Sequence, residues 1–187
     1  MQPNNNTEFG EADMEDQRYP IGRFTPERNV TDGKREQWIA TIEALPANLR
    51  TAVDGLTGAQ LDTPYRNGGW SVRQVVHHLA DSHLNGYIRM KLALTEEAPV
   101  VKTYDQEAWA QQTEARTASI AMSLALLDGL HQRWTAALRA LAPADFARRF
   151  THPESGVLTV DFLLDLYAWH SRHHVAHITA LRKRQDW

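Results

Sequence analysis

The sequence of 187 residues contains no cysteine. This absence excludes disulfide scaffolds, cysteine-based zinc sites, thiolate nucleophiles and iron–sulfur clusters. Any metal site in this protein must therefore use histidine, carboxylate or water as its ligands.

Long apolar runs and an excess of positive charge are also missing. No segment approaches the roughly 18–20 apolar residues that a membrane span needs, and Met1–Arg18 has no apolar core of the kind found in secretory signals. The formal net charge is −3, and Lys and Arg are scattered apart from a short basic cluster at Leu181–Gln185. We therefore expect a cytoplasmic protein that binds neither membranes nor nucleic acid.

Several common catalytic motifs are absent. The sequence has no Gly-rich phosphate loop, no dinucleotide fingerprint and no His-Glu-x-x-His motif that would place a general base beside metal ligands. A Ser–His–Asp triad could be assembled from Ser82 or Ser171. Neither serine lies on a nucleophile-elbow motif, so we disfavour this alternative.

The chain divides into a leader and one domain. Residues 1–17 are rich in Asn, Glu and Asp and predict a flexible leader. Residues 18–187 are expected to form a single domain, because the chain is long enough for one core and short for two. The extended, turn-like run Tyr19-Pro20-Ile21-Gly22 is expected to begin the ordered part.

Four amphipathic helices are predicted by apolar residues at helical spacing. They cover about Asp32–Gly55, Ser71–Leu94, Ser119–Leu141 and Thr159–Lys183. Ser71 is the expected N-cap of the second helix, and Pro46 predicts a kink or a break near Leu45 in the first. Helices of about 20 residues suit a four-helix bundle with one shared core, so the expected fold class is all-α.

Three connections carry further predictions. Leu61–Trp70 is expected to be a loop, because it contains Pro64 and a Gly-Gly pair. Ala98–Thr117 predicts a long connection with a short helix at Asp105–Gln112, where a lid or a partner contact could lie. Phe146–Val160 predicts a small hairpin before the last helix, because a Gly turn separates two short apolar segments.

Histidine is unusually frequent, with nine residues, most of them in two short stretches. The last predicted helix carries His170, His173, His174 and His177 within or at the edge of its apolar face. A buried imidazole without a partner costs about 1–3 kcal/mol, and one metal ion can satisfy two imidazoles that lie one turn apart. The pairs His170/His174 and His173/His177 both have this spacing, which does not choose between them.

The second stretch places His77, His78 and His83 on the second predicted helix. A bundle can supply a metal ligand from a facing helix. The helical wheel puts His83 on the apolar face and His78 at its flank, so periodicity alone mildly favours His83 as the third ligand. A hydrogen-bonded core histidine is the alternative for any single residue. Four histidines on one helical face, without cysteine, favour a metal.

The run Tyr65–His83, together with Tyr19–Gly22 and Trp169–Ile178, resembles the YfiT-like metal-dependent hydrolases of the DinB-like superfamily. This resemblance implies a homodimeric four-helix bundle that binds one divalent ion, zinc or nickel. The family's ligands are one His on helix two and a His-x-x-x-His on the last helix.

Carried over to this sequence, the family pattern implies His78, His173 and His177 as the metal ligands. We prefer His78 over His83 on this ground. Arg172 departs from the otherwise His-rich run, but it occupies no carried-over ligand position.

Three neutral imidazoles leave a fourth position for water, whose pKa the ion lowers towards about 7. We therefore expect a hydrolase of a small-molecule substrate in which metal-bound water is the catalytic group; no general base is identified. The open position could instead bind a thiolate, as in the thiol S-transferases and isomerases of the same superfamily. The second alternative is a non-catalytic module that binds a metal or a ligand, which a fourth protein ligand would favour.

Overall fold

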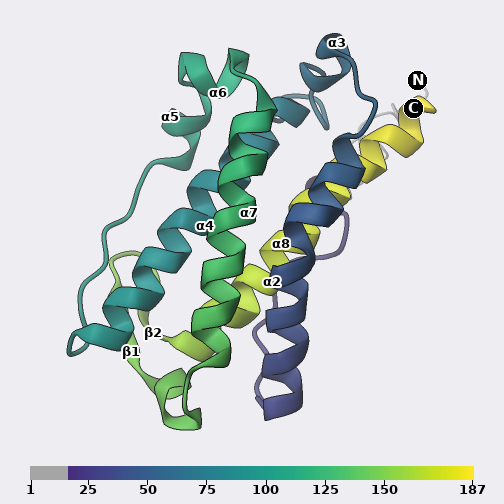
Figure 1. Cartoon of the computed structure of the whole chain (residues 1–187). Helices are drawn as coiled ribbons and strands as arrows, with labels where there is room; N and C mark the ends of the chain where they lie inside the picture. The colour runs from purple at the N-terminus through teal and green to yellow at the C-terminus, as the bar shows by residue number, and fades with distance from the viewer. Residues whose placement is uncertain (1–16) are drawn as a thin grey trace, which may run out of the picture.

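The chain is described from residue 17 to residue 187 in a computed structural model, so the predicted leader lies outside the described residues except for Gln17. Four long helices form a bundle (Figure 1): α2 (Asp32–Val53), α4 (Val72–Thr95), α7 (Ile120–Arg139) and α8 (Val160–Gln185). The helices α2 and α4 each pack against both α7 and α8. The predicted all-α four-helix bundle is confirmed. None of the described helices has both the length and the apolar character to cross a bilayer.

Hydroxyl side chains begin the helices that carry the histidines. The Ser71 hydroxyl accepts a hydrogen bond from the Gln74 N–H, and the Gln74 amide oxygen accepts one from the Ser71 N–H. The predicted N-cap at Ser71 is thus confirmed as part of a capping box. At the start of α8, the Thr159 hydroxyl accepts from the Phe162 N–H in the same way.

The helix α2 continues through Pro46, so of the predicted kink or break near Leu45 the break does not occur. Proline has no N–H, and the carbonyl of Ile42 one turn earlier therefore lacks its helical donor. The imidazole of His131 on α7 supplies a donor instead, with Nδ1 at 2.6 Å from that carbonyl oxygen. A side chain from a neighbouring helix thus completes the hydrogen bonding of α2.

The connections between the long helices contain three short α-helices in the described part of the chain. α3 (Gly58–Leu61) precedes the predicted loop, and α5 (Gln106–Ala110) lies within the predicted short helix at 105–112. α6 (Thr113–Thr117) follows α5 and was not predicted, because five residues are too few to show an apolar period.

A small antiparallel hairpin precedes α8, as the sequence predicts. The 3₁₀ helix η1 (Pro143–Ala147) leads into β1 (Arg149–His152), which pairs with β2 (Gly156–Thr159). Phe150 lies opposite Leu158 in this register, and Phe150 is almost completely buried. The hairpin therefore closes one end of the bundle.

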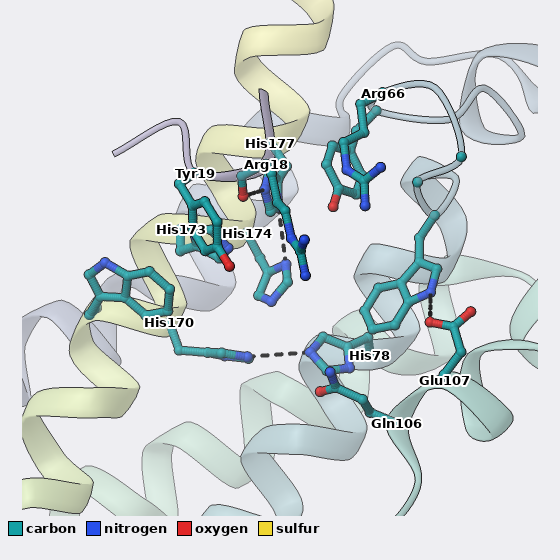
Figure 2. Close-up of a pocket in the computed structure, with 15 residues that line it drawn as sticks. Arg18, Tyr19, Arg66, His78, Gln106, Glu107, His170, His173, His174 and His177 are labelled. Carbon is teal, nitrogen blue, oxygen red and sulfur yellow. Dashed lines mark hydrogen bonds between the residues drawn. The ribbon is translucent and has the colours of Figure 1, made fainter. Parts of the chain in front are cut away.

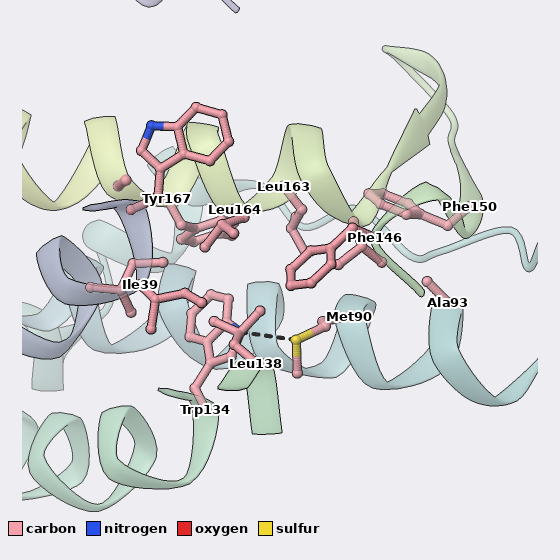
Figure 3. Packing of buried hydrophobic residues seen from close by; sticks show 14 of the residues in the cluster. Ile39, Met90, Ala93, Trp134, Leu138, Phe146, Phe150, Leu163, Leu164 and Tyr167 are labelled. Carbon is pink, nitrogen blue, oxygen red and sulfur yellow. Dashed lines mark hydrogen bonds between the residues drawn. The ribbon is translucent and has the colours of Figure 1, made fainter. Parts of the chain in front are cut away.

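The core consists of two hydrophobic clusters with a polar layer between them. The first cluster contains Trp134 and Met90, whose indole N–H and sulfur lie 3.2 Å apart (Figure 3). The second contains Leu79 and Leu127. On α4, His83 lies between Leu79 of one cluster and Met90 of the other, and it is fully buried. The interior of the bundle therefore includes imidazoles that need polar partners.

Gly86 allows α4 to approach α8 closely at this layer. A Cβ atom at this position would lie 2.4 Å from Cζ of Tyr167 and 2.8 Å from the Trp134 ring. Only a residue without a side chain fits there, and the close approach brings the histidines of α4 towards those of α8.

Candidate metal centre

A cavity of about 280 Å³ lies between α4 and α8 (Figure 2). Five of its lining residues are histidines: His78 from α4, and His170, His173, His174 and His177 from α8. Each of the α8 histidines has another of the four at three or four positions away, so they lie on one side of that helix. His173, His174 and His177 are buried and His170 is half-buried, whereas Arg172 of the same run is exposed.

The cavity histidines form two groups in which one nitrogen from each ring lies within 4.8 Å of the others. One group is His78, His170 and His174, and the other is His173, His174 and His177. His174 belongs to both groups. Two sets of three imidazoles among the described residues are therefore close enough to share one ion.

The predicted ligands His78, His173 and His177 all line this cavity. The structure brings His173 and His177 together, with ring centres 4.3 Å apart. The imidazoles nearest to His78 belong to His170, with Nε2 atoms 3.3 Å apart, and to His174, with ring centres 4.8 Å apart. The predicted set spans both groups, and its assignment as the ligand set remains a prediction.

The other histidines of α4 lie away from the cavity. His83, which the helical wheel favours, is buried behind His170, with its Nε2 3.2 Å from Nδ1 of His170. His77 is 2.7 Å from the Ser123 hydroxyl through Nδ1 and 3.3 Å from the Ala118 carbonyl oxygen through Nε2. His78 lies at the flank of the apolar face of α4, but α4 packs against both α7 and α8, so a flank residue can still point into the cavity. The helical wheel alone does not show this.

The serines considered for a catalytic triad have other partners. The Ser171 hydroxyl donates to the Tyr167 carbonyl at 2.6 Å, and the Ser82 hydroxyl donates to the Tyr167 hydroxyl at 3.5 Å. Neither serine hydroxyl has a hydrogen bond to an imidazole among the described residues. Residues 17–187 therefore show no Ser–His–Asp triad around these serines.

Burial keeps the cavity imidazoles neutral. Desolvation, together with the nearby charges of His173 and His177, lowers the pKa of His78 to about 3. Desolvation also lowers the pKa of His173 to about 3 and that of His177 to about 4. His170 and His174 also have pKa values well below 6.5 because of burial. Neutral imidazole is the form that binds metal ions.

The nitrogen positions fit a small divalent ion. Two ligands of a tetrahedral ion at about 2.0–2.1 Å lie about 3.3–3.4 Å from each other. The two Nδ1 atoms of His174 and His177 are 3.3 Å apart, as are the Nε2 atoms of His78 and His170. His173 Nδ1 is buried and has no hydrogen-bond partner among the described residues. A metal ion bound by such a group would give this nitrogen a partner.

Aromatic rings orient the imidazoles. Tyr65 stacks on His177 with ring centres 4.0 Å apart, and the Trp70 ring lies 4.6 Å from that of His78. Trp169 stacks on His173 at 4.2 Å. Tyr65 and Trp70 come from the loop before α4, so this loop contacts one histidine from each helix.

The wall also includes residues to which the sequence analysis assigned no role. The backbone carbonyl of Arg18 accepts a hydrogen bond from His177 Nε2 at 3.0 Å, and Arg66 lines the cavity beside Tyr65. Gln106 and Glu107 reach the cavity from the connection that was expected to hold a lid or a partner contact. A single arginine or glutamate carries no periodic signal, so only the tertiary structure identifies these residues.

The chain is similar to a superfamily model and to proteins named as metal-dependent hydrolases. The DinB superfamily model matches residues 41–178. The chain is 52% identical over 170 residues to "Putative metal-dependent hydrolase YfiT" of Bacillus subtilis, covering 90% of this chain and 96% of the relative. It is 51% identical to OB0782 of Oceanobacillus iheyensis, which has the same descriptive name, over 91% of this chain and 99% of that relative.

Solved structures agree with the fold. YfiT from Bacillus subtilis superposes with a TM-score of 0.90 at 51% identity, covering 92% of this chain and 99% of that one. The four-helix bundle protein TT2238 superposes with a TM-score of 0.52 at 22% identity, over 82% of this chain and 99% of that chain. The second likeness supports the bundle fold alone.

Proposed function

The chain belongs to the DinB superfamily and is YfiT-like, and on that basis we propose that it is a metal-dependent hydrolase acting on a small-molecule substrate. One observation carries this proposal: five neutral imidazoles from α4 and α8 converge on a single cavity. The cavity volume of about 280 Å³ suits a small molecule rather than a polymer segment.

The proposed ligands of one divalent ion are His78, His173 and His177. They line the same cavity from two helices, and burial lowers the pKa of each. An ion on this set would link α4 to α8. Zinc and nickel both accept imidazole, so the donor type alone favours neither.

A divalent ion held by imidazoles lowers the pKa of a coordinated water and polarises a carbonyl or phosphoryl oxygen. The chain supplies the surroundings. Trp70 and Tyr65 hold the rings of His78 and His177 by aromatic contact. Glu107 is the one carboxylate on the wall among the described residues, and it accepts hydrogen bonds from Trp70 and Gln111.

Metal analysis tests the ligand set. We expect the purified protein to hold one ion per chain, and His78→Ala, His173→Ala and His177→Ala each to lose it, while His152→Ala outside the cavity retains it. Retention of the metal in His78→Ala together with its loss in His174→Ala would show instead that His173, His174 and His177 are the ligands.

Activity measurements test the reaction. We expect the zinc- or nickel-loaded protein to hydrolyse at least one compound in a panel of esters, amides and phosphate esters. Chelation should abolish the turnover, and His173→Ala should lower it at least about a hundredfold. A stoichiometrically loaded protein that hydrolyses nothing would contradict the proposal. Turnover that requires an added low-molecular-weight thiol would assign the site to thiol transfer.

A further inference from the structure

The loop before α4 is built to place one arginine over the cavity. The Tyr65 N–H donates to the Trp70 carbonyl at 3.0 Å, and the Gly69 N–H donates to the Arg66 carbonyl at 3.0 Å. Gly68 has a φ of 66°, a left-handed conformation that favours glycine. The loop is therefore a closed turn with a defined shape.

Gly69 makes room for the stem of Arg66. A Cβ atom on Gly69 would lie 2.7 Å from Cγ of Arg66 and 3.2 Å from the Tyr65 ring. The absence of a side chain at position 69 lets the Arg66 side chain fold over the turn towards the cavity (Figure 2). The direction of this arginine thus depends on the local backbone as well as on its own rotamer.

The charge of Arg66 is not neutralised by a carboxylate among the described residues. Its Nη1 donates to the Asn67 carbonyl at 2.9 Å, and its buried Nε has no hydrogen-bond partner within the same part of the chain. Two other well-covered arginines, Arg35 and Arg73, differ from Arg66 in this respect. Arg35 and Arg73, whose side chains are 17% and 12% exposed, lie 2.7 Å from Asp161 and Asp62 respectively.

Arg18 brings a second guanidinium to the same cavity. Its side chain extends towards the histidines (Figure 2). The guanidinium carbon of Arg18 lies 5.6 Å from the centre of the ring of Tyr19, the next residue in the chain. No carboxylate of residues 17–187 lies within ion-pair distance of Arg18. The carboxylate of Glu107 is on the wall but is hydrogen-bonded to Trp70 and Gln111.

We propose that Arg66, assisted by Arg18, forms an anion subsite of this cavity, and that the substrate carries a carboxylate or a phosphate group. A guanidinium presents several N–H donors in one plane and binds both groups through paired hydrogen bonds. The substrate class rests on the proposed function, because a hydrolase substrate must reach the imidazoles. The anionic group of the substrate would be held beside the histidines, and the bond that is hydrolysed would face the imidazoles.

Isothermal titration with inorganic phosphate and with acetate tests the subsite and distinguishes the two anions. Both probes are titrated into metal-loaded and chelator-treated protein. We expect the chelator-treated protein to bind at least one of them, and Arg66→Gln to weaken that binding about tenfold or more. Arg18→Gln should weaken it less. Arg133→Gln, an exposed arginine on α7, is the matched control and should leave binding unchanged.

Gly69→Ala provides a second variant that keeps the charge. The added Cβ should displace the Arg66 stem and weaken anion binding without removing the guanidinium. Unchanged affinity in Arg66→Gln, or no binding of either anion to the wild type, would overturn the subsite. The readout is independent of turnover. Anion binding that depends on Arg66 in a protein that hydrolyses nothing would leave the subsite intact and refute only the hydrolase.

Discussion

His131 interacts with the backbone of a helix other than its own. Its Nδ1 donates to the Ile42 carbonyl that Pro46 leaves without a helical N–H, and its ring is only 1% exposed. Burial lowers the pKa of His131 to about 4, so the ring is neutral at pH 7. Its Nε2 has no hydrogen-bond partner in the described residues. The hydrogen bond from Nδ1 to the Ile42 carbonyl is therefore the interaction that offsets the cost of burying the His131 ring.

A double-mutant cycle measures this interaction. His131→Leu removes the donor, whereas Pro46→Ala restores a backbone N–H to the same carbonyl. We therefore expect His131→Leu to be less destabilising in the Pro46→Ala background, with a coupling of about 1–2 kcal/mol in the free energy of unfolding. Urea denaturation at pH 7 provides the four values. Ser123→Ala, also on α7, should combine additively with Pro46→Ala, and zero coupling for His131 would refute the interpretation.

At the scale of elements, the loop at residues 65–70 and the start of α4 act together. The capping box at Ser71 and Gln74 begins α4 where the loop ends, and the Gln74 amide also donates to the Ala110 carbonyl at 2.7 Å. Hydrogen bonds of Gln74 therefore connect the end of the loop, the start of α4 and α5. The position of Trp70 against His78 depends on this junction.

Ser71→Ala tests the junction. Loss of the cap should lower the free energy of unfolding by about 1 kcal/mol, since two backbone N–H groups share the capping box. Ser155→Ala in the exposed turn of the hairpin is the control and should have little effect. Equal stability of the two variants in urea denaturation would show that the cap contributes nothing measurable.

At the scale of the whole molecule, the bundle places an imidazole layer between two apolar clusters. Buried polar groups lower stability unless they are paired. In this layer the rings mainly contact one another, and His83 Nδ1, His131 Nε2 and His173 Nδ1 have no hydrogen-bond partner among the described residues. Ligand binding by the cavity histidines would therefore stabilise the folded state.

Metal removal should reveal that stabilisation. A ligand present at a thousand times its Kd, and bound only by the folded state, adds about 4 kcal/mol to the free energy of unfolding. We expect chelation to lower the Tm of the wild type, and readdition of zinc or nickel to restore it. His177→Ala should show no difference between the two conditions, and a metal-independent Tm in the wild type would contradict the proposed site.

The metal-free protein should lose stability on acidification. His78 and His177 have folded pKa values of about 3 and 4, below their ordinary value of 6.5. Between about pH 6.5 and 4 the unfolded chain therefore binds more protons than the folded one, so the free energy of unfolding falls as the pH falls. Each histidine contributes at most about 1.4 kcal/mol per pH unit to the free energy of unfolding in this window. His78→Gln should flatten the slope measured by urea denaturation, and an unchanged slope would refute the burial argument.

Much of the fold is predictable from the sequence because its signals act over one or two helical turns. Apolar spacing predicts the four long helices, Ser71 predicts a helix start, and a Gly turn predicts the hairpin. Of the predicted kink or break at Pro46, the break does not occur, because the missing hydrogen bond is supplied from α7 by a residue far away in sequence. The short helix α6 was missed because its length is below one apolar repeat.

The sequence by itself determined that α8 carries a face of four histidines and that no cysteine thiolate of this chain can share a metal with them. Only the tertiary structure decided which histidine of α4 enters the cavity beside that face, because this depends on how two neighbouring helices are rotated. His78 enters the cavity, while His83 lies behind His170. The two arginines reach the same cavity from a turn and from the N-terminal segment, and chain topology, unlike helical periodicity, can bring such distant residues together.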